Sequence, residues 1–93
     1  MPKICVLGLG YIGLPTSVVF AQYGFKVIGV DINPIIVKKI NSGESHIVEP
    51  NLNEQLKSVL KNKSFVARTS PVEADIFIIA VPTPYIVGEN GIF

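Results

Sequence analysis

Three glycines and one aspartate form the clearest chemical pattern in this sequence. Gly8, Gly10 and Gly13 have the spacing G-x-G-x-x-G between an apolar run and a stretch with helical spacing. Asp31 ends the next apolar run, close to the spacing of about 20 residues expected of an acid that binds a ribose. Backbone N–H groups at a helix N-terminus bind phosphate, and a carboxylate accepts hydrogen bonds from ribose hydroxyls. The pattern therefore predicts a dinucleotide site.

Each glycine has its own physical task in this prediction. Gly8 permits a tight turn out of the preceding strand. Gly10 lets the backbone approach a pyrophosphate, and Gly13 lets the helix pack closely on the sheet. The alternative is a glycine-rich turn beside a solvated aspartate. The order strand, turn, helix, strand and acid argues against that alternative.

Asp31 also bears on the choice of cofactor. Its carboxylate would repel a 2′-phosphate, and no Lys or Arg lies between Ile32 and Val37 to attract one. NAD is therefore favoured over NADP. FAD shares the same glycine pattern, but no residue here selects it.

The elements that must position these residues alternate between strand and helix. Runs rich in β-branched residues predict strands, and apolar residues at helical spacing predict helices. Strands are expected at 3–7, 25–30, 65–69 and 75–81, and helices at 12–22, 34–41 and 51–61. This alternation predicts an α/β fold with a doubly wound, Rossmann-type parallel sheet. The chain supplies its first four strands, in the order 3-2-1-4.

Helix starts are predicted at three places. Asn33 and Pro34 have the residue types of an N-cap and a first helical position. Asn51 and Glu54 resemble a capping box, and residues 70–73 form a second one that should open one short turn.

Composition excludes several classes of function. The net charge is +1 and no basic stripe is present, so a nucleic-acid partner is not expected. The uncharged run 4–21 would also fit a signal peptide or membrane anchor, but its glycine spacing favours the dinucleotide prediction, and no membrane partner is expected. The sequence contains no Cys/His cluster of the kind that binds a metal, so no metal site is expected. The only cysteine, Cys5, cannot form an internal disulfide, so a cytoplasmic protein is expected.

Several side chains have simpler expected roles. Cys5 should be a buried apolar thiol in the first strand, and Phe20, Tyr23 and Phe25 should belong to the core. The only histidine, His46, is expected to be a loop residue rather than a catalytic base, because no partner for it can be named. Two roles stay open for Glu49, which either approaches the nicotinamide side or begins the following helix.

The fourth predicted strand, 75–81, is apolar on both faces. Such a strand belongs in the middle of a parallel sheet. In the order 3-2-1-4 it is an open edge, so we expect exposed apolar surface there and self-association into a homo-oligomer.

Four longer stretches resemble one enzyme family, the UDP-sugar and GDP-sugar 6-dehydrogenases. They are GLGYIGLPTSVVFA (8–21), VIGVDIN (27–33), KINSGESHIVEPNL (39–52) and VEADIFIIAVPTP (72–84). The resemblance covers nearly the whole chain, to about Tyr85. HIVEP and VPTP favour the branch that acts on UDP-N-acetylmannosamine, with the UDP-glucose branch as the alternative.

The resemblance implies further roles. The backbone groups of Tyr11 and Ile12 would lie at the pyrophosphate of NAD, Asp31 at the ribose, and Thr83 beside the cofactor. The family oxidises the sugar C6 alcohol to a carboxylate in two hydride transfers, with two NAD, a nucleophilic cysteine, a lysine and an asparagine. Those three residues lie downstream of this chain, and Cys5 cannot replace the nucleophile. Residues 1–93 are therefore expected to be a truncated NAD-binding domain, inactive alone, whose full-length parent takes a UDP-sugar.

Two other functions share part of the pattern. A stand-alone NAD-sensing module that regulates a partner, or a different Rossmann dehydrogenase such as a hydroxyacid type, would keep the glycines and the acid. HIVEP and VPTP argue against both. One departure from the family is Ile36, where several relatives have a basic residue five positions after the ribose-binding acid.

Overall fold

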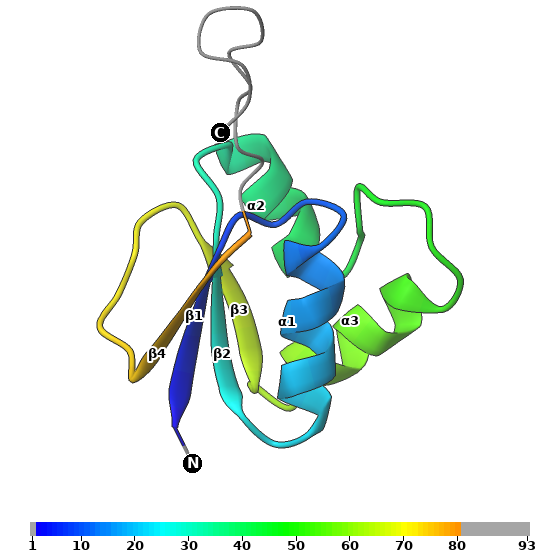
Figure 1. The fold of residues 1–93 in the computed structure, drawn as a ribbon. Helices are drawn as coiled ribbons and strands as arrows, with labels where there is room; N and C mark the ends of the chain where they lie inside the picture. The colour runs from blue at the N-terminus through cyan, green and yellow to red at the C-terminus, as the bar shows by residue number, and fades with distance from the viewer. Residues whose placement is uncertain (1, 81–93) are drawn as a thin grey trace, which may run out of the picture.

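Four short apolar segments pair as parallel strands, and three helices connect or flank them. The computed structural model describes residues 2–80. Its elements are β1 (Lys3–Leu7), α1 (Gly13–Gln22), β2 (Lys26–Val30), α2 (Pro34–Asn41), α3 (Leu52–Lys61), β3 (Phe65–Arg68) and β4 (Ile76–Ile79) (Figure 1). The sheet has the order β3-β2-β1-β4, which confirms the predicted 3-2-1-4.

The helices cover one face of the sheet. Figure 1 shows α1 against the strands, with α3 beyond it and α2 near the carboxyl ends of the strands. Alternate strand residues such as Ile4 and Val6 point into the core under these helices, where they meet Leu14 and Val18 of α1. Both α1 residues are fully buried, as their helical spacing predicts.

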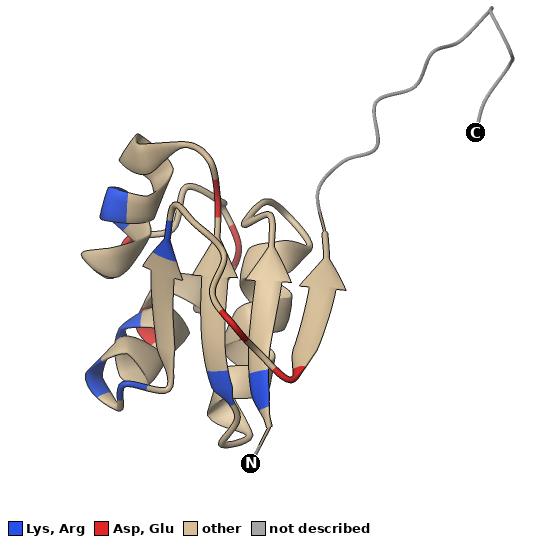
Figure 2. Cartoon of the chain, turned by 90° about the vertical axis from the view of Figure 1, so that its left-hand side faces the viewer, with Lys and Arg blue, Asp and Glu red and all other residues tan. Residues whose placement is uncertain are grey.

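The opposite face of the sheet is thinly covered. Cys5, Ile28 and Val30 are buried there, and the connection between β3 and β4 packs on them through Val72 and Ala74. Figure 2 shows this connection running across that face. Cys5 is 0% exposed, which confirms the prediction of a buried thiol. The edge strand is less protected.

β4 carries the exposed apolar surface that the sequence predicts. Phe77 is paired in register with Cys5, and Ile79 with Leu7, so both belong to the thinly covered face. Their side chains remain 51% and 71% exposed.

The connection 69–75 corrects one prediction, because residues 70–73 form no helical turn. From the end of β3 to the start of β4 the chain must pass three strand spacings, roughly 14 Å sideways, and about 13 Å back along the strands. Seven extended residues span about 23 Å, whereas a helical rise would cover only about 11 Å. An extended segment makes this crossing with length to spare, whereas a helical turn over residues 70–73 would leave almost none.

The two predicted asparagine caps have different outcomes. Asn33 is confirmed as the N-cap of α2, since its Oδ1 accepts hydrogen bonds from the N–H groups of Ile35 and Ile36 at 3.0 and 3.4 Å. The capping box at Asn51 is wrong. Asn51 has φ 63° and makes no side-chain cap, because the chain enters α3 through a turn in which Leu52 N donates to Glu49 O at 3.2 Å.

All three helices end in the same hydrogen-bonded motif. The residue after each C-cap has positive φ: Gly24 after α1, Gly43 after α2 and Lys63 after α3. In α3, Lys63 N donates to Leu60 O and Ser64 N to Val59 O, both at 3.0 Å, which is the Schellman pattern. Lysine stands where the other two helices have glycine.

The outer edge of β3 is occupied by a side chain. The Asn41 amide donates from Nδ2 to the Ala67 carbonyl and accepts at Oδ1 from the Ala67 N–H, each at 2.9 Å. Asn41, the last residue of α2, thereby replaces a neighbouring strand at that position.

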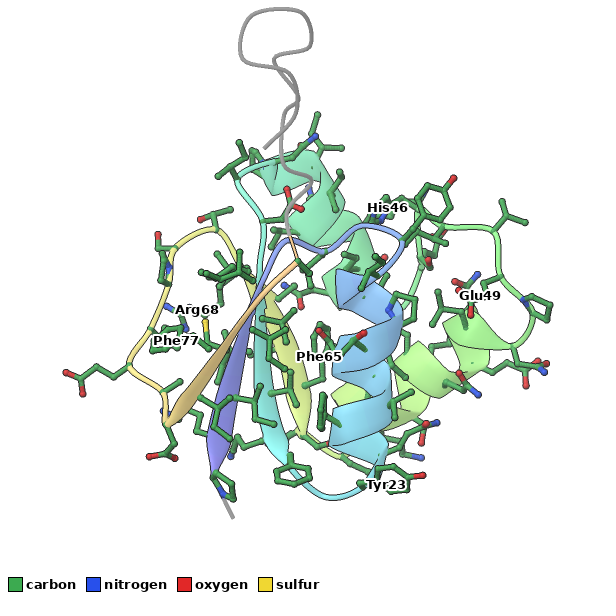
Figure 3. All side chains as sticks on the ribbon, in the orientation of Figure 1. Tyr23, His46, Glu49, Phe65, Arg68 and Phe77 are labelled. Atoms are coloured by element: carbon green, nitrogen blue, oxygen red, sulfur yellow. The ribbon has the colours of Figure 1, made fainter. Side chains whose placement is uncertain are left out.

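The aromatic predictions hold in part. Phe20 and Phe25 pack against the core and against each other, with ring centroids 5.7 Å apart at an interplanar angle of 86°. Tyr23 is 75% exposed, so its placement in the core is wrong. It is the C-cap of α1, where the chain leaves the helix at the surface (Figure 3).

The uncharged run 4–21 forms most of β1, the glycine-rich turn and most of α1. Across residues 2–80, no helix combines the length and the apolar character needed to cross a bilayer.

Candidate dinucleotide site

A cavity of about 540 Å³ lies at the carboxyl ends of the strands. This volume is within the usual range for a small-molecule site, and this end of an open α/β sheet is where ligands bind. All four strand ends contribute to its lining. The lining residues are Leu7, Gly8, Leu9, Gly10, Val30, Asp31, Ile32, Ile36, His46, Thr69, Pro71 and Ala80.

The glycine-rich turn forms one wall, and each glycine occupies a different environment. Gly8 has φ 101°, which favours glycine, and its N–H donates to Val30 O at 2.7 Å. A Cβ on Gly13 would overlap the Gly8 carbonyl oxygen, so close packing requires a glycine there. A Cβ on Gly10 would meet no atom of the described chain within 4 Å. The space beside Gly10 is thus available to a ligand.

The start of α1 suits an anion. Its N-cap, Ile12, makes no side-chain cap, and the first turn carries no acid. Tyr11 and Ile12 are 79% and 71% exposed, so the turn preceding the helix is open to solvent. Free N–H groups and the positive end of the helix dipole favour a phosphate at such a terminus.

Asp31 stands opposite the turn, at the end of β2. Its Oδ2 accepts a hydrogen bond from Leu9 N at 3.1 Å, and its Oδ1 accepts one from Asn33 N at 3.0 Å. An ionised carboxylate has about four acceptor positions, so about two remain for a ligand. The two backbone bonds fix the orientation of the carboxylate at the cavity wall.

The structure brings together most of the predicted site residues. Gly8, Gly10 and Asp31 line one cavity, while Tyr11, Ile12 and Gly13 lie in the adjoining turn and helix start. Thr83 is outside the described residues.

Other lining residues were not predicted as site residues. Thr69 and Pro71 follow β3, and the rule that ligands lie at carboxyl ends of strands could have identified them. Ile36 contributes from α2. His46 also lines the cavity, although its sequence position predicts only a loop residue.

His46 and Glu49 belong to the same loop but lie in different places. Figure 3 shows His46 beside the glycine-rich turn and Glu49 toward α3. Glu49 lines a separate surface hollow of about 310 Å³, and its carbonyl takes part in the turn into α3. Its position therefore agrees with the second of its two open roles, at a helix start.

The described residues of this cavity offer groups that bind a ligand rather than groups that catalyse a reaction. Among the described residues of its lining, only Asp31 and His46 have titratable side chains, and Cys5 lies in the buried cluster on the other face of the sheet. No group of three His, Cys, Asp or Glu residues within 2–80 could hold a metal ion. An open glycine turn, an uncapped helix start and an oriented carboxylate together fit a diphosphate and a ribose.

A family model matches residues 2–91 of this chain. It is described as the NAD-binding domain of the UDP-glucose/GDP-mannose dehydrogenase family.

Individual relatives agree with this match. A UDP-N-acetyl-D-mannosamine dehydrogenase from Campylobacter jejuni is 58% identical over 88 residues, which are 95% of this chain and 21% of that protein. The native structure of the UDP-N-acetyl-mannosamine dehydrogenase from Staphylococcus aureus is 49% identical with a TM-score of 0.88, over 90% of this chain and 20% of that one. GDP-mannose dehydrogenase from Pseudomonas aeruginosa, solved as a ternary complex, is 33% identical with a TM-score of 0.84, over 95% of this chain and 21% of that one. This chain therefore spans about a fifth of the length of these relatives.

Proposed function

Because this chain belongs to the UDP-glucose/GDP-mannose dehydrogenase family and matches its NAD-binding domain, we propose that the cavity binds the adenosine and diphosphate half of NAD. The observation that carries the proposal is that Gly10, with open space beside it, and Asp31, with an oriented carboxylate, share one cavity.

Each site residue has a role in the proposal. The backbone of Gly8 to Ile12 and the N-terminus of α1 receive the diphosphate, and Gly13 holds the helix close to the sheet. Asp31 accepts hydrogen bonds from the adenosine ribose. The family resemblance assigns Thr83, which is outside the described residues, to a role beside the cofactor.

Specificity for NAD over NADP follows from the surroundings of the ribose. Asp31 would repel a 2′-phosphate. Ile32 and Ile36 line the cavity beyond it, and no Lys or Arg belongs to the described lining. A 2′-phosphate would therefore have no cationic partner there.

We assign the parent enzyme the oxidation of a nucleotide-sugar C6 alcohol to a carboxylate, most similar to the UDP-N-acetylmannosamine type. Bound NAD supplies the hydride acceptor for this chemistry. In this assignment residues 1–93 bind cofactor without turnover, and the cysteine, lysine and asparagine of catalysis belong to later segments of a homo-oligomeric parent. The printed names of the relatives support the substrate class.

Calorimetric titration of the 93-residue chain with NAD and NADP tests the binding assignment. We expect NAD to bind and NADP to bind at least tenfold more weakly. A folded chain that binds neither would contradict the proposal.

The parent assignment is tested in the source gene. A reading frame that continues past Phe93 to a cysteine, with a lysine and an asparagine, supports it. Purified parent protein should then reduce NAD in the presence of UDP-N-acetylmannosamine. Reduction with UDP-glucose alone would assign the UDP-glucose branch instead.

A further inference from the structure

His46 has a buried hydrogen-bonding atom without a partner. Within residues 2–80, its Nδ1 is the only buried side-chain nitrogen or oxygen that lacks a hydrogen bond. Buried polar groups are nearly always paired, and the His46 side chain lines the binding cavity, so a ligand bound there can supply the missing partner.

The backbone on both sides of His46 is fixed. Ser45 Oγ accepts a hydrogen bond from Ile47 N at 2.8 Å and donates one to Ile47 O at 3.0 Å. Ser45 N donates to Asn53 Oδ1 at 2.7 Å, and the Ile47 side chain is buried in the core. These contacts tie the loop to α3 and to the core. The imidazole is therefore held at the cavity wall beside the glycine-rich turn (Figure 3).

His46 differs from the other described residues of the cavity lining in the charge that its side chain can carry. Among the described lining residues, it is the only side chain able to carry a positive charge. Ile36, an apolar residue of the same lining, occupies the position five residues after Asp31. A dinucleotide diphosphate carries negative charge, and among the described lining residues only His46 has a side-chain N–H to donate to it.

We propose that His46 donates a hydrogen bond from its imidazole to a phosphoryl oxygen of the bound dinucleotide. The inference rests on the proposed function and assigns a side-chain contact to the same site. An imidazole with its proton on Nδ1 donates from that atom, and the partner it meets sets the tautomer. A phosphoryl oxygen bound by the imidazole would thus give His46 the hydrogen-bond partner that the described chain does not supply.

The test compares ligands that share the adenosine but differ in the diphosphate. NAD, ADP and adenosine are titrated into the 93-residue chain and into His46→Leu, with NMR titration for the weakly bound adenosine. We expect the variant to lose about tenfold or more in affinity for NAD and ADP. Its affinity for adenosine should be unchanged. His46→Asn keeps a side-chain N–H near the position of Nδ1 and should recover part of the loss.

Val48→Ala is the matched control. Val48 lies in the same loop, is fully exposed and does not belong to the described cavity lining, so the ratio of NAD to adenosine affinity should stay at the wild-type value. Equal NAD affinity of His46→Leu and wild type would overturn the inference and leave the proposed function intact. A parallel loss for NAD and adenosine would also overturn it, since that result indicates general damage to the site. Failure of the wild-type chain to bind NAD would overturn the proposed function and the inference with it.

Discussion

The carboxylate of Asp31 accepts a hydrogen bond from the backbone N–H of Leu9 at 3.1 Å, which joins the end of β2 to the glycine-rich turn after β1. The acid therefore has two tasks that substitutions can separate. One is to hold the turn, and the other is to offer its remaining acceptor positions to a ribose.

Asp31→Asn and Asp31→Ala should differ in stability but not in binding. Both variants lose the charged acceptor, so we expect NAD affinity to fall about tenfold or more. Asparagine keeps an oxygen for Leu9 N–H, whereas alanine leaves that donor unpaired, at a cost of about 1–3 kcal/mol. Calorimetry gives the affinities and thermal unfolding gives the stabilities. Wild-type affinity for NAD in either variant would contradict the assignment of Asp31 to the ribose site.

Gly10→Ala and Gly13→Ala should have opposite effects. A methyl group on Gly10 enters open space, so the midpoint of thermal unfolding should hardly change while NAD binding is lost to steric exclusion. A methyl group on Gly13 overlaps the Gly8 carbonyl, so we expect a loss of about 1–3 kcal/mol in stability. Calorimetry for NAD affinity and thermal unfolding for stability distinguish the two variants. Undiminished NAD binding by Gly10→Ala would show that the diphosphate does not approach this position.

Lys63→Gly should stabilise the chain. Lys63 has φ 61° at the end of α3, a conformation that costs an L-residue roughly 1–2 kcal/mol and glycine much less. Glycine also has a larger conformational entropy in the unfolded state, which offsets part of this stabilisation. We therefore expect a net gain of about 0.5 kcal/mol in the free energy of unfolding, or a few degrees in the midpoint of thermal unfolding. Lys61→Gly is the control, because Lys61 is helical and its replacement should destabilise by about 0.5–1 kcal/mol. A loss of stability in Lys63→Gly would contradict the prediction.

Phe77→Lys should weaken self-association. Phe77 is half-exposed on the edge strand β4, and a lysine on an edge strand opposes pairing with a second copy. We expect wild type to sediment as a reversible oligomer and the variant to need at least tenfold higher concentration to associate. Val48→Lys is the control, since Val48 is an equally apolar but fully exposed loop residue away from the sheet. A wild-type chain that remains monomeric at high concentration would refute the prediction.

The sequence predicted the sheet order and the meeting of Gly8 and Asp31 at one end of the sheet, because strand and helix patterns are local and a fold rule then orders the strands. Strand runs, helical spacing and the positions of Gly8, Gly13 and Asp31 are short-range features with a mechanism behind each. The N-cap at Asn33 is equally local, and it was confirmed.

The wrong predictions concern features that the tertiary structure determines. Residues 70–73 have the composition of a capping box, but the distance between the ends of β3 and β4 favours an extended crossing. Asn51 has a capping side chain, yet the turn from Glu49 sets its positive φ. His46 stands 15 residues after Asp31 in the chain (46 − 31 = 15), and only the folded loop brings both to one cavity.

The Asn41 amide on Ala67 makes the two borders of the sheet unequal. One border is already engaged by a side chain, while β4 has no described strand beyond it. Two copies that join through their β4 strands about a two-fold axis would each present outward the β3 border, where Asn41 already occupies Ala67. The side chain would oppose further growth by strand addition, which favours a dimer of finite size over a fibril.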